Sequence, residues 1–79
     1  MNHAEIARAR YNEARAIKDA WAHRLRLAER ALSHAIQNGH NPDPAHRAIQ
    51  ATKIRYDDAT TDQQLALDAL PTWTEKRAA

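Results

Sequence analysis

Apolar residues recur every three or four positions along two long stretches of the chain. Side chains with this spacing fall on one face of a helix, so the pattern predicts two amphipathic helices. The first stripe consists of Ala4, Ala7, Tyr11, Ala14, Ile17, Trp21, Leu25, Ala28, Leu32, Ala35 and Ile36. The second stripe consists of Ala45, Ala48, Ile49, Thr52, Tyr56, Ala59, Ala66, Leu67 and Leu70.

One cluster of helix-breaking residues separates the two stretches. Gly39 can adopt the left-handed conformation that ends a helix. Asp43 is a favourable N-cap residue, and Pro44 would then occupy the first helical position, where a missing N–H costs nothing. Pro71 disfavours helix at the residue before it. We therefore expect one domain over residues 1–79, with helices at about 3–38 and 44–70, a loop at 39–43 and a tail at 71–79.

A short loop between long helices makes them antiparallel neighbours. The predicted fold is therefore all-α: an antiparallel two-helix hairpin with coiled-coil-like packing. Folding the chain about residue 41 places Trp21 opposite the small Ala59 and brings Lys18 towards Asp62. Surface ion pairs of this kind contribute about 0–1 kcal/mol each, so they would set the alignment more than the stability.

Composition agrees with helices and argues for a partner. Eighteen residues are Ala, and Val and Phe are absent, which disfavours an all-β fold. A core with so few large apolar residues would give a single hairpin only marginal stability. The chain has no Cys that could form a stabilising disulfide bond. Both helices carry a second apolar stripe, which could pack in a homodimeric four-helix bundle: Ala9, Ala16, Ala20, Leu27, Ala31, Ala51, Ile54, Leu65 and Ala69.

Leu27, Ile54 and Leu65 are the large members of this second stripe, and they are our candidate self-association residues. Single exposed apolar residues are normal on a protein surface, but three that are aligned are less so. The alternative is that Ala is present only as a helix former and that these faces are hydrated.

No residue pattern for catalysis, a metal or a cofactor is evident. The five histidines lack the i, i+4 spacing of a helical metal pair, and three of them are six residues apart: His34, His40 and His46. The aspartates of the second helix are spread around it, and there is no Gly-rich phosphate loop. We therefore expect a protein that is not an enzyme and has no metal or cofactor.

The first helix carries a line of arginines on one outer face, formed by Arg8, Arg15, Arg26 and Arg30. A linear arginine stripe can follow a phosphate backbone or an acidic groove of a protein. Glu5 and Asp19 lie near the same face, and no aromatic residue alternates with the arginines to stack on bases. An ordinary hydrated helix face is the alternative.

Trp73 follows Pro71 in the tail. It could fold back over Ile6 and Tyr11 and cap the open end of the hairpin. Alternatively it could anchor a partner, since Trp is enriched among interface hot spots.

These observations favour binding over catalysis. Our first hypothesis is a protein–protein interaction module: a small adaptor, regulator or inhibitor that binds a larger protein through a helical face. Short Ala- and Arg-rich helical proteins of this kind suit accessory proteins of bacteria or their phages. Nucleic-acid binding through the arginine line is an alternative, although the net charge is only +2. A structural or assembly bundle is a third hypothesis.

We expect the protein to be cytoplasmic, without a membrane partner. No segment approaches the roughly 20 apolar residues that span a bilayer. The first residues also lack the apolar core of a signal peptide.

Overall fold

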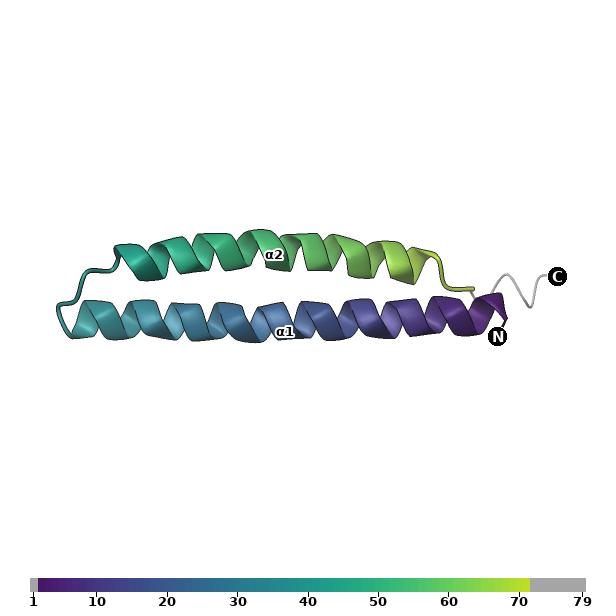
Figure 1. Cartoon of the computed structure of the whole chain (residues 1–79), viewed down its shortest axis with the longest axis horizontal. Helices are drawn as coiled ribbons and strands as arrows, with labels where there is room; N and C mark the ends of the chain where they lie inside the picture. Colours follow the sequence, from purple (N-terminus) through teal and green to yellow (C-terminus); the bar gives the residue numbers. More distant parts are fainter. Residues whose placement is uncertain (1, 72–79) are drawn as a thin grey trace.

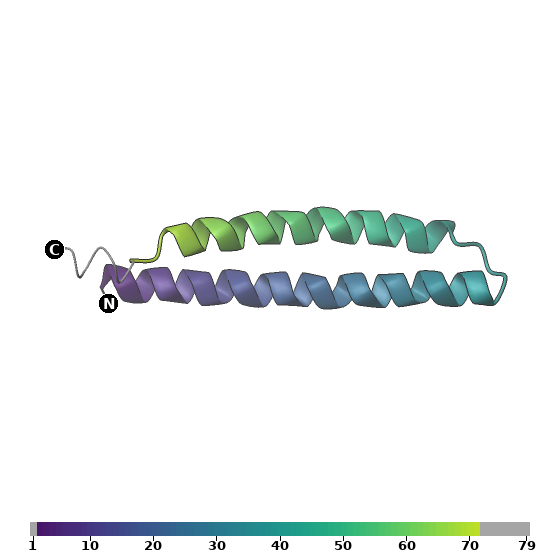
Figure 2. The ribbon, with the colours of Figure 1, turned by 180° about the vertical axis from the view of Figure 1, so that it is seen from behind.

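Two long helices lie side by side and run in opposite directions. The computed structural model describes residues 2–71, in which α1 (His3–Gln37) is followed by α2 (Asp43–Asp68). Figures 1 and 2 show the two helices aligned along their length from opposite sides, joined at one end by a short loop. The predicted all-α antiparallel hairpin is confirmed.

The ends of α1 are closed by hydrogen bonds from neighbouring residues. At the start, the Asn2 side-chain oxygen accepts the backbone N–H of Glu5 at 2.9 Å. At the end, Gly39 has a φ of 68°, and the next N–H, from His40, donates to the carbonyl of Ala35 at 2.8 Å. This is the Schellman arrangement, in which glycine accepts the left-handed conformation at low cost.

The start of α2 differs by one residue from the sequence prediction. Asp43 is the first helical residue and not the N-cap, so Pro44 lies one position further into the first turn. The side-chain oxygen of Asn41 accepts the Asp43 N–H at 3.1 Å, so it satisfies a donor that a helix start would leave free. The helix ends at Asp68, and a turn carries the chain to Pro71.

The residues between the helices alternate strictly in steps of three and four. We call this set the seam. Its residues are half-buried except for Ala59, which is buried. Ala22, which follows the seam residue Trp21, is half-buried as well. The mean seam spacing of 3.5 residues is that of a left-handed coiled coil. The seam comprises Ala4, Ala7, Tyr11, Ala14, Lys18, Trp21, Leu25, Ala28, Leu32 and Ala35 of α1 and Pro42, Ala45, Ile49, Thr52, Tyr56, Ala59, Gln63, Ala66 and Leu70 of the second half.

Four members of the predicted stripes lie outside the seam: Ile17, Ile36, Ala48 and Leu67. Ile17 is 47% exposed, and the seam position belongs to its neighbour Lys18. The strict alternation of three and four places Lys18 between the helices, where its methylene stem can pack while its ammonium group lies over the Tyr56 ring. Ile36 and Leu67, at 62% and 44% exposed, also lie outside the seam.

The helices are also offset from the predicted alignment. Folding about residue 41 placed Lys18 near Asp62, whereas the Lys18 Nζ lies 5.9 Å from the centroid of the Tyr56 ring. Figure 1 shows the reason: the loop runs back beside α1, so α2 begins level with a point inside α1 and not with its last turn. Each residue of α1 therefore faces an earlier residue of α2 than symmetric folding would give.

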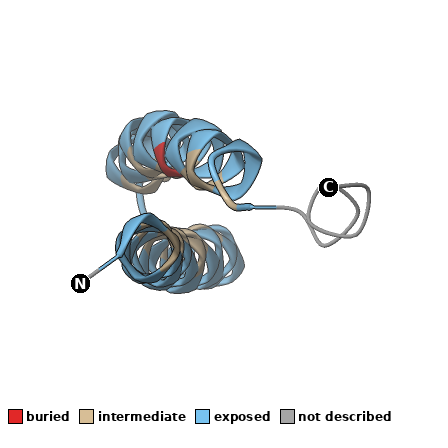
Figure 3. Cartoon of the chain, turned by 90° about the vertical axis from the view of Figure 1, so that its right-hand side faces the viewer, coloured by how far each residue is buried: buried red, intermediate tan, exposed pale blue. Residues whose placement is uncertain are grey.

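Burial in this hairpin is slight. Ala59 is the one buried residue among those described, and Figure 3 shows that the half-buried residues lie where the two helices face each other. The radius of gyration is 18.2 Å, against about 12 Å for a compact chain of this length. The chain exposes 6399 Å², against about 4,900 Å² for a compact protein of its mass. The hairpin therefore leaves an unusually large surface for a partner.

Candidate interaction surfaces

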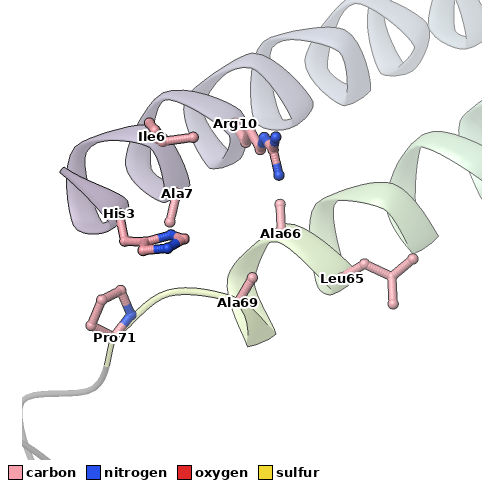
Figure 4. Close-up of a pocket in the computed structure, with 8 residues that line it drawn as sticks. All are labelled: His3, Ile6, Ala7, Arg10, Leu65, Ala66, Ala69 and Pro71. Carbon is pink, nitrogen blue, oxygen red and sulfur yellow. The ribbon is translucent and has the colours of Figure 1, made fainter. Parts of the chain in front are cut away.

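A hollow at the open end of the hairpin shows which residues of the two helices share a side. It has a volume of about 550 Å³ and is lined by His3, Ile6, Ala7, Arg10, Leu65, Ala66, Ala69 and Pro71. Figure 4 shows His3 towards Pro71, Ala7 towards Ala69 and Arg10 towards Ala66. Ile6 and Leu65 therefore lie on the same side of the seam.

The heptad repeat extends this side along the whole hairpin. In a coiled coil, positions that are a multiple of seven residues apart lie on the same side of the helix. The positions that share a side with Ile6, Arg10, Leu65 and Ala69 follow from this rule. All of them are exposed, and apolar residues alternate there with charged residues and histidine; we call this side the apolar flank. The apolar members are Ile6, Ile17, Ala20, Leu27 and Ala31 of α1 and Ala48, Ala51, Leu65 and Ala69 of α2.

Four of the seven large apolar residues that the described chain exposes belong to this flank. They are Ile6, Ile17, Leu27 and Leu65, which are 37%, 47%, 48% and 63% exposed. Monomeric proteins seldom leave an aligned apolar face of this kind in water, and such faces mark interaction sites. The apolar flank is therefore the main candidate interaction surface.

The three candidate self-association residues do not share one surface. Leu27 and Leu65 belong to the apolar flank. Ile54, which is 63% exposed, lies at the heptad position on the far side of α2 from the seam. One interface can therefore include Leu27 and Leu65 together while leaving Ile54 outside it.

The predicted arginine line lies on the other side of the hairpin. Arg8 and Arg15 directly follow the seam residues Ala7 and Ala14, which places them across the seam from the apolar flank. Arg26 lies further out on that side and Arg30 points away from α2, and all four arginines are exposed. We call this side the polar flank. The hairpin thus has two chemically different sides.

The cations near the seam lie against aromatic rings. The Arg24 Cζ is 4.7 Å from the centroid of the Trp21 ring, three residues earlier on α1, and Lys18 lies over Tyr56. Such contacts are worth about 0.5–1 kcal/mol at exposed sites. They partly cover two of the three aromatic residues of the seam, Trp21 and Tyr56.

The histidines near the loop make local contacts. The rings of His34 and His40 stack with centroids 6.4 Å apart, and the Asn38 side-chain nitrogen lies 3.2 Å from Nδ1 of His34. Within residues 2–71, no three His, Cys, Asp or Glu side chains are grouped so that they could hold a metal ion. A second hollow, lined by Asp43, His46, Arg47 and Gln50, is formed by one helix alone.

Trp73, a candidate partner-binding residue, lies outside the described residues. Both hypotheses for it therefore stay predictions. The described chain does show an apolar hollow directly beside Pro71, two residues before Trp73.

Comparison with known proteins gives no relative: no family model, curated protein or solved structure matches the chain. Neither described helix combines the length and the apolar character needed to cross a membrane.

Proposed function

We propose that this chain is a non-catalytic protein–protein interaction module, a small adaptor, regulator or inhibitor that acts in the cytoplasm by binding a larger protein through a helical face. The observation that carries the proposal is that the hairpin exposes two chemically different sides: the polar flank, with Arg8 and Arg15, and the apolar flank, with four exposed large apolar residues. Burying apolar surface yields about 25 cal/mol per Å², so such a flank is a ready source of binding free energy.

The polar flank supports contact with a larger, acidic partner. Arg8 and Arg15 are exposed on the side away from the apolar flank. Guanidinium groups can form paired hydrogen bonds to carboxylates, which makes arginine suited to acidic protein surfaces. In this proposal the apolar flank packs against a second copy in a four-helix bundle, and the polar flank meets the larger protein.

The proposal is tested with the immobilised full chain and a lysate of its source cells. A bound protein is identified by mass spectrometry, purified, and titrated by calorimetry against the wild type and two variants. We expect the Arg8→Glu, Arg15→Glu variant to weaken binding at least tenfold, which is about 1.4 kcal/mol. Asp19→Asn, on the same helix, is the matched control and should bind at least as well as wild type.

Two results would overturn the proposal. One is the absence of any saturable protein partner. The other is retardation of duplex DNA or RNA by the chain at about 50 mM salt, with an affinity that falls steeply as salt rises. That second result would favour the nucleic-acid alternative for the same four arginines.

A further inference from the structure

The charged residues of the apolar flank are sorted by sign along its length. The residues that face each other at the open end, and the contact of Lys18 with Tyr56, show which residues of α1 and α2 lie at the same height along the hairpin. Counting equal numbers of residues along both helices from these pairs gives the relative height of the others. Glu13 is then level with Asp62, and Asp58 is level with Ile17. These three acids occupy the half of the flank nearer the open end.

Cations of the flank occupy the other half. Arg55 is level with Ala20, and Arg24 lies one turn further towards the loop, about level with Ala51. Arg10 is the exception, near the open end beside Leu65. One half of the flank is thus mainly acidic, the other is basic, and the change of sign falls between Ile17 and Ala20.

We infer that the apolar flank is covered by a second copy of this chain, turned end over end by a twofold axis that crosses the flank between Ile17 and Ala20. Charge complementarity argues for this occupant, because the turn lays the acidic half of each copy on the basic half of the other. Glu13 then meets Arg24 of the second copy, and Asp58 meets Arg55 of the second copy. Each contact occurs twice.

The same turn places three of the four large apolar residues against small ones, and it places Leu27 against Arg10 of the second copy, whose methylene stem can pack on it. Ile17 meets Ala20 of the second copy, Ile6 meets Ala31, and Leu65 meets Ala48. Interdigitation of large and small side chains is what close packing requires.

The other face-to-face arrangement has copies that point the same way. Each α1 would then lie on α2 of the second copy at the same level, so Glu13 would meet Asp62 and Ile17 would meet Asp58. Glu13 and Asp62 are both carboxylates, so they would repel each other at both copies of this contact. The order of charges along the flank therefore favours the end-over-end dimer.

This inference deepens the proposed function, because it names a second copy as the occupant of the apolar flank. It also leaves Arg8 and Arg15 on the outside of the four-helix bundle, where a larger protein can reach them. The proposal of a dimer and the proposal of a larger partner can be disproved independently. A monomer that binds a larger protein would overturn only the dimer, and a dimer without a saturable protein partner would overturn only the proposed function.

The test uses charge reversal at the Glu13–Arg24 contact, measured by sedimentation equilibrium of the full chain. Glu13→Arg alone and Arg24→Glu alone each place like charges together at both contacts, so each should weaken the dimer at least tenfold. Mixing these two variants should restore wild-type affinity, because both contacts of the mixed dimer would again join an arginine to a glutamate. The doubly substituted chain E13R/R24E should also dimerise as wild type.

Two controls keep the test sharp. Arg26→Glu reverses a charge on the polar flank and should leave the dimer unchanged. Circular dichroism of each variant establishes that helicity is kept, and recovery in the mixture shows that a weakened variant still folds. A monomeric wild type, a Glu13→Arg variant that dimerises more tightly, or a mixture no tighter than either variant alone would overturn the inference.

Discussion

The ammonium group of Lys18 lies over the ring of Tyr56, with Nζ 5.9 Å from the ring centroid. Both residues occupy seam positions, so this contact shows that they lie at about the same height along the hairpin. A polar residue at such a position commonly costs stability while it specifies alignment. The same alignment of the two helices decides which charged residues of α1 and α2 lie side by side on the apolar flank.

Replacing Lys18 tests that relationship. Lys18→Met keeps a flexible stem in the seam but removes the charge, so we expect stability to rise by about 0.5–1 kcal/mol and Tm to rise by about 4 °C. Thermal unfolding is followed by circular dichroism at one fixed chain concentration, since association shifts Tm. Arg15→Met, an exposed charge removal on the same helix, should change stability by less than about 0.5 kcal/mol. A lower Tm for Lys18→Met would mean that the contact with Tyr56 outweighs the cost of the charge.

The periodicity was enough to predict the hairpin, but the place of Lys18 shows what it missed. The pattern of apolar residues alone favours Ile17 over Lys18 as the residue between the helices, although a lysine stem can also pack there. Strict steps of three and four select Lys18 and Gln63 as seam positions, and they place Ile17 on the apolar flank. The offset between the helices depends on the path of the loop, where Asn41 and Gly39 act through local hydrogen bonds and backbone conformation that hydrophobic spacing does not encode.

Ala59 tests how closely the helices approach. It is 4% exposed, so a larger side chain there must push the helices apart. We expect Ala59→Leu to destabilise the hairpin by about 1–3 kcal/mol, measured by urea unfolding. The matched control is Ala16→Leu, an exposed position on the far side of α1, which should be nearly neutral. Equal stability of both variants would contradict the described packing.

Gly39 tests the turn that ends α1. Its φ of 68° is accessible to glycine but strained for other residues, although a Cβ there would meet no atom within 4 Å. We therefore expect Gly39→Ala to cost about 1–2 kcal/mol through backbone strain alone. Asn tolerates this conformation better, so Gly39→Asn should cost less. The comparison is made by chemical unfolding, and an alanine variant as stable as wild type would argue against the left-handed turn.

The N-cap of α1 offers a local test at the open end. The Asn2 side chain accepts the Glu5 N–H, and losing such a cap costs about 0.5–2 kcal/mol. We expect Asn2→Ala to lower helicity mainly in the first turns, detected as faster amide hydrogen exchange there. Asn2→Asp keeps an accepting oxygen and should retain protection. Unchanged exchange in Asn2→Ala would show that the cap does not hold this end.

The central claim is that the apolar flank is the interface between two copies of the chain, and that the rest of the surface takes no part in this dimer. Light scattering after size exclusion measures this directly, at low salt and at about 0.5 M salt. Three chains are compared: the wild type, Leu27→Arg with Leu65→Glu, and Ile36→Glu with Ile54→Glu. Leu27→Arg faces Arg10 of the second copy, so it places like charges together at the interface. We predict twice the 9.0 kDa chain mass for the wild type and for the Ile36, Ile54 variant at both salt concentrations. The Leu27, Leu65 variant should have the mass of a single chain and keep most of its helicity. A wild type of 9.0 kDa, or a Leu27, Leu65 variant that associates as the wild type does, would contradict the account.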